Sequence, residues 1–456
     1  MIPVVTPEQM RRIDAGAVEP LEVLIERAGW AVASAARRIL GGTYGRRIAV
    51  LVGKGNNGAD GRVAARVLER WGARCEVHGA DALPASFPAN RQHPIDLVVD
   101  ACYGTGFRGT FHAPSTDAPV LAVDIPSGVD GLTGAVSGVP FRAIETVTFV
   151  APKPGLFLHP GAEFVGNVTV ADIGLRVPAS ENVNRFLLDE GEAAVAWPRR
   201  SGTAHKWRSA VWVIGGSAGL EGAPRLAALG AARAGAGYVR LSIPGLERAA
   251  SSLMEVVGHP IGLEWADEVL RDAGRFGALV LGPGLATDER QREQVAVAVE
   301  RWPGTVVVDA GGLHALGVVG EGRSVWASRT IPPVLTPHDG EFVRMGGRLA
   351  DRLDSVESMA VASSAVVLLK GPTTLIASPD GSTILSTSGD ARLATAGSGD
   401  VLSGVIGAAL ALGLEPARAA ALATSVHGLA ARRGPEVGLM AGDLPGLVSA
   451  VLSDAS

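Results

Sequence analysis

Four glycine-rich turns of the sequence carry acidic, amide and hydroxyl side chains in patterns that favour proton transfer and ligand binding. Three lie in the first half, GKGNNGADG at 53–61, DACYGTGFRGT at 100–110 and DIPSGVDG at 124–131, and the fourth is AGSGD at 396–400. The glycines alone predict only tight turns. The carboxylates and amides between them therefore carry the chemical information.

Two acidic residues of the first half, Asp100 and Asp124, each end an apolar run. An aspartate at the end of a strand often caps the helix that follows, which is one explanation for either residue alone. Two such carboxylates, with Asn57 and Ser127 in neighbouring turns, instead supply a set of hard oxygen ligands. Such a set suits a cation such as potassium or magnesium, so the sequence predicts a functional site at these turns.

Near the end of the chain, Gly397 and Gly399 lead directly into an apolar segment that is typical of a buried helix. Free N–H groups at the start of such a helix converge on one point and, with the helix dipole, attract an anion. Asp400 lies in this first turn, where an acid can simply complement the dipole. Because a carboxylate would repel an anion bound at this turn, Asp400 needs a further reason to be there, and removal of a proton from a substrate is such a reason. We therefore predict that Asp400 is a general base.

The elements around these turns predict an α/β protein of two domains. Short runs rich in Val and Ile, without alternation, are typical of parallel strands covered on both faces. They are IAVLV, IDLVVD, VLAVD, ETVTFV and NVTVAD in the first half, and SAVWVIGGS, GYVRLSI, GALVLGPG, TVVVDAGG, AVVLLKG and TTLIAS in the second. In such sheets ligands bind at the carboxyl ends of the strands. The rhythm is lost between residues 182 and 207, so we place the domains at 1–200 and 201–456.

Composition excludes several classes of protein. Of 456 residues, 47% are apolar and 19% charged, which permits substantial cores and gives no signature of disorder. A net charge of −5 without a basic stripe makes nucleic acid an unexpected partner. Cys75 and Cys102 lack any metal-ligand spacing, so we expect buried, reduced thiols and a cytoplasmic protein. We see no signal peptide, and the longest apolar run, 401–414, is too short to span a membrane.

The three turns of the first half, in this order and spacing, resemble the epimerase domain of NAD(P)H-hydrate repair enzymes, which has a Rossmann-like, three-layer parallel sheet. The resemblance implies that Asp124 is catalytic and faces the hydrated nicotinamide ring, and that K⁺ is held by Asn57, Asp100 and Ser127. The chain departs from the family at Ala59, where Gly is usual, and at Arg27, where Asn is usual. The residues that the resemblance implies for substrate binding are Asn56, Asn57, Gly58, Ala59, Asp60, Gly104, Thr105, Gly106, Phe107, Arg108, Gly109 and Thr110.

The GSGD turn resembles that of the ribokinase-like fold, in which the aspartate deprotonates a hydroxyl that attacks a phosphoryl group. Together with LGPGL at 281–285, VLTPHDGEFVRM at 334–345 and LLKGPTTLI at 368–376, it resembles the ADP-dependent NAD(P)H-hydrate dehydratase domain, over nearly all of residues 204–450. The resemblance implies that Gly284, His338 and Asp400 contact the hydrated nucleotide, with Mg²⁺ or backbone N–H groups offsetting phosphate charge. The residues that it implies for binding the adenine nucleotide are Lys370, Gly371, Pro372, Thr373, Thr374, Gly397, Ser398 and Gly399.

We therefore expect a bifunctional enzyme that interconverts R and S NAD(P)H-hydrate and dehydrates the S epimer with ADP, giving NAD(P)H, AMP and phosphate. Its ligands are then the hydrate and ADP, and the habit of the family implies a homo-oligomer. Two alternatives stay open: a small-metabolite kinase fused to a nucleotide-binding domain, and a non-catalytic sensor of nicotinamide nucleotides. The sequence does not decide between ADP and ATP, or between NADH hydrate and NADPH hydrate.

Overall fold

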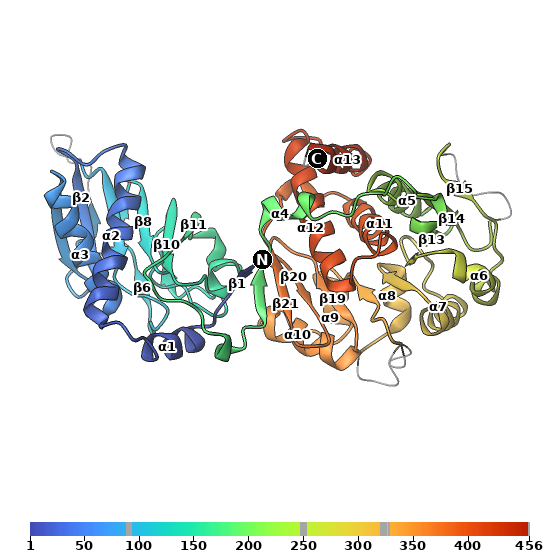
Figure 1. Ribbon diagram of the computed structural model, residues 1–456, viewed down its shortest axis with the longest axis horizontal. Coiled ribbons are helices and arrows are strands. Elements are labelled where there is room, and N and C mark those ends of the chain that lie inside the picture. The colour runs from blue at the N-terminus through green and yellow to red at the C-terminus, as the bar shows by residue number, and fades with distance from the viewer. Residues whose placement is uncertain (88–93, 247–252, 320–325, 327–328, 455–456) are drawn as a thin grey trace. The chain divides into compact units, whose positions relative to one another are not determined.

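A computed structural model describes residues 1–87, 94–246, 253–319, 326 and 329–454 (Figure 1). The chain divides into two compact units: Pro3–Val183 forms the first, and Asn184 onward, together with Met1–Ile2, forms the second. The predicted boundary near residue 200 is therefore misplaced. Residues 184–200 belong to the second unit because strand β12 (Arg185–Leu187) pairs with β21 (Thr383–Ser386), and Arg185 forms an ion pair of 2.7 Å with Glu357.

The first domain is built on a parallel sheet, as its apolar runs predict. Among the described residues the strand order is β11-β10-β8-β5-β2-β3, and every pair in it is parallel. The carboxyl ends of the strands consequently share one edge of the sheet. The strands are β2 (Arg47–Val52), β3 (Arg74–Gly79), β5 (Leu97–Ala101), β8 (Val120–Val123), β10 (Glu145–Phe149) and β11 (Asn167–Ala171).

Two helices cover one face of this sheet, α2 (Leu21–Leu40) and α3 (Asn56–Arg70). They approach each other closely where Gly29 lies against Val63, since a Cβ on Gly29 would come within 2.4 Å of the Val63 side chain. A cluster that includes Phe87, Phe111 and Phe141 covers the opposite face. Helix α1 (Pro7–Ala15) begins with a capping box between Thr6 and Gln9.

The second domain has an eleven-stranded sheet among its described residues, in the order β1-β12-β21-β20-β19-β18-β17-β16-β13-β14-β15. The pairs β19–β20 and β20–β21 are antiparallel, whereas the consecutive pairs from β15 to β19 are parallel. Its remaining strands are β1 (Ile2–Pro3), β13 (Ala210–Ile214), β14 (Tyr238–Ser242), β15 (Val257–Gly258), β16 (Ala278–Leu281), β17 (Thr305–Val308), β18 (Val334–Leu335), β19 (Val366–Leu369) and β20 (Thr374–Ala377).

Helices cover both faces of the second sheet (Figure 1). On one face, α11 is buried along most of its length and approaches α5 so closely that a Cβ on Gly404 would lie 1.9 Å from the carbonyl oxygen of Ala227. None of the described helices is long and apolar enough to cross a membrane. The helices are α4 (Glu190–Val195), α5 (Gly222–Arg233), α6 (Ala266–Asp272), α7 (Glu289–Arg301), α8 (Gly311–Leu316), α9 (Asp339–Arg344), α10 (Arg352–Ser363), α11 (Ser398–Ala411), α12 (Pro416–Arg433) and α13 (Leu444–Asp454).

Both cysteines are free thiols, as the sequence predicts, but only one is fully buried. Cys102 is enclosed beyond the end of β5, whereas Cys75 is half-buried because β3 is an edge strand. Burial nevertheless raises the pKa of Cys75 to about 12, so its thiol is unreactive at neutral pH.

Candidate functional sites

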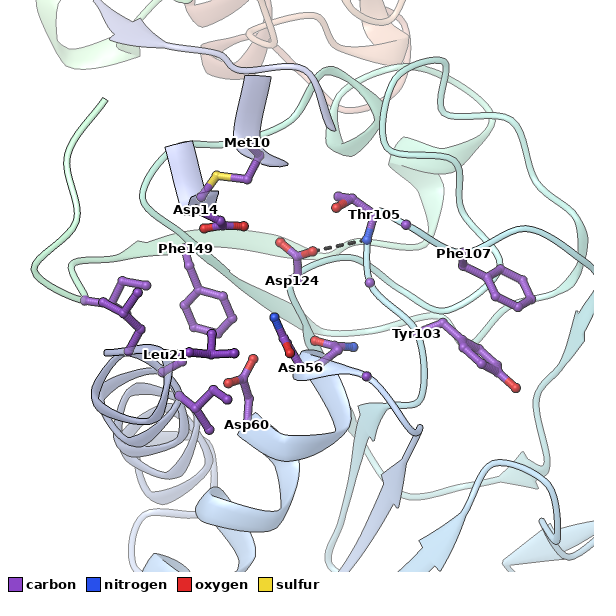
Figure 2. A pocket seen from close by; sticks show the side chains of 18 of the residues that line it. Met10, Asp14, Leu21, Asn56, Asp60, Tyr103, Thr105, Phe107, Asp124 and Phe149 are labelled. Atoms are coloured by element: carbon purple, nitrogen blue, oxygen red, sulfur yellow. Dashed lines mark hydrogen bonds between the residues drawn. The ribbon is translucent and has the colours of Figure 1, made fainter. Parts of the chain in front are cut away.

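The first domain has a cavity of about 870 Å³ at the carboxyl edge of its sheet (Figure 2). It brings together side chains from α1, α2, the start of α3 and the loops after β5, β8 and β10. The polar and charged residues of its wall include Asp14, Glu19, Asn56, Asn57, Asp60, Tyr103, Thr105, Arg108, Asp124 and Lys153. The predicted gathering of polar side chains at this edge is therefore seen in the structure.

Asp124 is held in a fixed position by donors on both carboxylate oxygens. The ammonium of Lys153 donates to Oδ1 at 2.8 Å, and the Thr148 hydroxyl donates to the same oxygen at 3.2 Å. The backbone N–H of Thr105 donates to Oδ2 at 3.2 Å, a contact drawn in Figure 2. Only 2% of the Lys153 side chain is exposed, so this ion pair is shielded from water.

Two properties of Asp124 are typical of a functional residue. Its backbone has a φ of 66°, in the left-handed region that residues with a side chain rarely adopt. Burial alone would raise its pKa, but the ammonium of Lys153 and the hydrogen bonds from Lys153, Thr105 and Thr148 hold the pKa below its usual value. Asp124 is therefore ionised at neutral pH.

Asp60 is in the opposite electrostatic state. It is only 6% exposed, and among the described residues its carboxyl has no ion-pair or hydrogen-bond partner. Burial, followed by the negative charges of Asp124 and Asp14, raises the pKa of Asp60 to about 8. Asp124 and Asp60 thus give the cavity a carboxylate and a carboxylic acid at neutral pH, an arrangement that suits general acid and base catalysis.

Asp100, Ser127 and Asn57 were predicted to hold a cation. Ser127 donates to the carboxylate of Asp100 through its backbone N–H at 2.9 Å and its hydroxyl at 2.7 Å, and both residues are fully buried. Burial raises the pKa of Asp100, although the hydrogen bonds from Ser127 and Cys102 oppose this. The amide oxygen and nitrogen of Asn57 are buried without a hydrogen-bond partner in the described part of the chain.

The predicted substrate-binding residues divide into two groups. Asn56, Asn57, Asp60 and the run from Gly104 to Arg108 line the cavity. Gly58, Ala59, Gly109 and Thr110 do not form part of its described wall. Gly58 supports the turn instead, because a Cβ there would lie 2.0 Å from the carbonyl oxygen of Gly53.

The two departures from the family pattern have simple structural explanations. Ala59 lies inside α3 and is not among the residues with positive φ, so the turn does not require glycine there. Arg27 does not line the cavity; its guanidinium pairs with Glu19 at 2.7 Å and donates to the carbonyl oxygen of Ile173 at 2.9 Å. It thereby ties α2 to two residues of the cavity wall.

Two charged residues of the cavity wall, Lys153 and Asp14, were not predicted from the sequence. Lys153 follows β10 at the same edge as the predicted acids, so the rule that drew attention to Asp100 and Asp124 also applies to it. Asp14 comes from α1, which no glycine motif marks, and partial burial raises its pKa.

In the second domain a buried ion pair lies at the carboxyl edge of the sheet. The ammonium of Lys370, which follows β19, lies 2.9 Å from Oδ1 of Asp309, which follows β17. The hydroxyl of Ser403 on α11 donates to Oδ2 of Asp309 at 2.5 Å. Ala310, the next residue, has φ 47° and ψ −118°, so the backbone beside this carboxylate is strained.

Asp400 and the glycines before it lie next to this pair. The N-cap of α11 is Gly397, with a φ of 91° and no side-chain cap, and a Cβ on Gly399 would lie 3.3 Å from the Lys370 ammonium. Burial and the charge of Asp309, opposed by Lys370, raise the pKa of Asp400 to about 7. A carboxyl group with this pKa is suited to accept a proton near neutral pH.

His338 and Gly284, which were predicted to contact the hydrated nucleotide, lie in turns with well-defined backbone contacts. Nδ1 of His338 accepts the backbone N–H of Gly340 at 3.0 Å and caps α9, so a neutral ring carries its proton on Nε2. Gly284 has a φ of 66°, and its carbonyl oxygen accepts a hydrogen bond of 3.0 Å from the Ser217 hydroxyl.

The predicted nucleotide-binding residues fall into two neighbouring turns. Thr373 and Thr374 are buried, and the hydroxyl of Ser398 donates to the carbonyl oxygen of Leu393 rather than outward. The guanidinium of Arg352 donates to the carbonyl oxygen of Lys370 at 3.0 Å and pairs with Asp339. Asp339 therefore helps to anchor the turn that contains Gly371 and Pro372.

Fold and sites together define an enzyme of two α/β domains, each with buried acidic side chains at the carboxyl edge of a largely parallel sheet. A family model described as NAD(P)H-hydrate dehydratase matches residues 211–452. A second model, described as YjeF-related protein N-terminus, matches residues 21–86 and 77–155. The bifunctional NAD(P)H-hydrate repair enzyme of Moorella thermoacetica is 36% identical, with 96% of this chain and 94% of that protein covered. The chain belongs to the family of bifunctional NAD(P)H-hydrate repair enzymes.

Other relatives and solved structures agree with this assignment. The repair enzyme of the same name from Mycobacterium leprae is 36% identical, with 90% of this chain and 89% of that protein covered. An ADP/ATP-dependent NAD(P)H-hydrate dehydratase from Bacillus subtilis, co-crystallised with ATP and Mg²⁺, has a TM-score of 0.50 and 27% identity over 58% of this chain and 97% of that one. A ribokinase-like superfamily protein from Enterococcus faecalis has a TM-score of 0.51 and 19% identity over 60% of this chain and 97% of that one, which supports the fold alone.

Proposed function

We propose that the chain repairs hydrated NADH and NADPH in two steps. The first domain interconverts the R and S epimers of the hydrate, and the second uses ADP to dehydrate the S epimer, giving NAD(P)H, AMP and phosphate. The observation that carries the proposal is Asp400, a carboxyl with a pKa of about 7 in the first turn of α11, beside the ammonium of Lys370. The shared name of the relatives supports the choice of substrate.

In the first domain, Asp124 handles the proton at or near the C6 hydroxyl of the hydrate. The ammonium of Lys153 keeps Asp124 ionised and fixes its orientation, so the carboxylate is ready to accept a proton. Asp60 retains its proton at neutral pH and can donate it in the same cavity. The predicted substrate-binding residues of the cavity wall, Asn56, Asn57 and Gly104 to Arg108, hold the nucleotide.

The side chains of Asn57, Asp100 and Ser127 offer oxygen ligands that suit a potassium ion. The amide oxygen of Asn57 is buried without a partner, and no cationic side chain contacts the carboxylate of Asp100 among the hydrogen bonds of the described residues. K⁺ would be held by Asn57, Asp100 and Ser127, and when bound it supplies the positive charge that the buried carboxylate lacks.

In the second domain, Asp400 removes the proton from the hydroxyl that attacks the terminal phosphoryl group of ADP. Water is a poor leaving group and phosphate a good one, so phosphorylation prepares the hydrate for elimination. Lys370 and the backbone N–H groups of Gly397 to Gly399 stabilise the phosphate charge at the α11 N-terminus, next to the turn of Gly371 to Thr374. His338 and Gly284 contact the hydrated nucleotide.

Magnesium would reach this site with the nucleotide. The described residues contain no cluster of three or more His, Cys, Asp or Glu side chains that could hold a metal ion by itself, which suits an ion bound largely through phosphates. Bound Mg²⁺ neutralises charge on the transferring phosphoryl group.

The test is to mix the protein with NADH hydrate and ADP and to follow the absorbance of reduced nicotinamide. We expect Asp400→Asn to abolish most dehydration but to leave epimerisation intact, and Asp124→Asn to do the reverse when excess dehydratase consumes the S epimer. A stable phosphorylated product would instead favour a small-metabolite kinase, and binding without turnover would favour a sensor. Homo-oligomeric assembly and a cytoplasmic location remain predictions, which light scattering and cell fractionation can check.

A further inference from the structure

A second, smaller cavity adjoins the main cavity of the first domain. It has a volume of about 290 Å³ and is lined by Pro7, Arg11, Thr105, Gly106 and Arg108. Thr105, Gly106 and Arg108 also line the main cavity. The two spaces therefore share a wall, and a long ligand in the main cavity can extend towards Arg11 on α1.

Charge is distributed unequally between these two spaces. Figure 2 shows Asp14 and Asp60 on one side of the main cavity and Phe107 on the other, with Asp124 between them and hydrogen-bonded to Thr105. The positive charge of Lys153 is balanced by Asp124. The acidic side therefore has no cationic group to spare for an anionic ligand.

The two arginines of the smaller cavity do have donors to spare. The side chain of Arg108 is 76% exposed. Its ion pair with Asp130 is long, at 3.9 Å. One of its N–H groups donates to the carbonyl oxygen of Phe107, which leaves the others free for a ligand. Arg11 has no ion-pair partner within the described ranges of the chain.

A hydrated dinucleotide has two unlike ends. Its reduced nicotinamide ring is uncharged, whereas its pyrophosphate, and the 2′-phosphate of the NADPH form, are anionic. A phosphate beside Asp124 would meet the ammonium of Lys153, whose charge Asp124 already balances, whereas guanidinium groups with free donors bind phosphate oxygens in a bidentate fashion. On the premise of the proposed epimerase function, we infer that Arg11 and Arg108 form a subsite for a phosphate of the hydrate, with the ring directed towards Asp124.

Steady-state epimerisation kinetics test this subsite in the full-length chain, with excess separate dehydratase and ADP present. We expect Arg11→Ala to raise KM roughly ten-fold at low salt, because a hydrogen bond to a charged group is lost, and to leave kcat within about two-fold. Arg11→Lys should recover part of the loss. Arg12→Ala is the matched control, because Arg12 lies on the same helix but pairs with Glu8 and Glu181 outside the cavities.

The two hydrates distinguish the source of the phosphate. A rise in KM confined to NADPH hydrate assigns the 2′-phosphate to the subsite, and an equal rise for both hydrates assigns the pyrophosphate. Unchanged KM values for both hydrates would overturn the inference and leave the N-terminus of α3 as the phosphate site. Absence of epimerisation by the unmodified protein would instead reject the proposed function, so the two failures can be told apart.

Discussion

Replacing Lys153 with methionine tests whether the first domain depends on the charge pair that holds Asp124. Methionine keeps much of the length of the side chain but removes the ammonium that lies 2.8 Å from the carboxylate. The lysine is 2% and the aspartate 15% exposed, so the carboxylate would be left buried and unpaired. Breaking such a pair costs about 3–5 kcal/mol, a large part of the roughly 5–15 kcal/mol that stabilises a domain.

The sign of the pH dependence follows from the direction of the pKa shift. In the unmodified protein the pKa of folded Asp124 is lowered, so its contribution to stability is present above about pH 4 and is lost as the pH falls through the folded-state pKa. In Lys153→Met, burial without the ammonium raises this pKa, which penalises folding at neutral pH and relieves the penalty on acidification. The two proteins should therefore differ most near pH 7 and converge towards pH 4.

Calorimetry of the full-length chain measures the effect. At about 2–4 °C per kcal/mol for a domain of this size, we expect the transition of the first domain to fall by roughly 6–20 °C at pH 7. Lys54→Met is the matched control, since Lys54 is 91% exposed and lies 3.5 Å from Asp81; it should move the transition by no more than about 4 °C. The double variant Asp124→Asn with Lys153→Met should recover most of the stability but not the activity. An unchanged transition in Lys153→Met at pH 7 would refute the argument.

Three further predictions concern the other buried carboxyl groups. The rate of dehydration should fall as the pH drops below about 7, because the pKa of Asp400 lies there and only its ionised form accepts a proton; a flat profile from pH 5.5 to 8 would contradict this. Because the pKa of Asp60 is raised to about 8, the folded protein loses stability between about pH 4 and pH 8, so Asp60→Asn should gain in melting temperature over the unmodified protein as the pH rises through this range. Asp309→Asn should raise the KM for ADP roughly ten-fold or more, because Lys370 loses the carboxylate that holds it; an unaltered KM would show that Lys370 is positioned by other groups.

Much of both sites could be predicted because a parallel sheet gathers the ends of its strands. Asp100 lies near the end of β5 and Asp124 directly follows its neighbour β8, and the structure places both at one edge, as their apolar runs indicate. The start of α11 at Ser398 likewise follows from glycines placed before an apolar run. In these cases the information is local, and the general geometry of the fold supplies the rest.

The partners of these residues could not be predicted, because they depend on which strands become neighbours. Lys153 reaches Asp124 across 29 positions, and Lys370 reaches Asp309 across 61. The misplaced domain boundary has a related cause. Strand β12 has only three residues, and it is recognisable as a strand only once it pairs with β21.

The turn after β2 also limits how the first domain can change under mutation. A Cβ on Gly53 would lie 1.9 Å from the carbonyl oxygen of Cys102, and one on Gly58 would lie 2.0 Å from that of Gly53 itself. Backbone is here packed against backbone, so no shift of a side chain can relieve either collision. Directed evolution of this enzyme towards other nucleotides will therefore have to vary lining side chains, such as Asn56 and Arg108, and leave the backbone of the turn after β2 as it is.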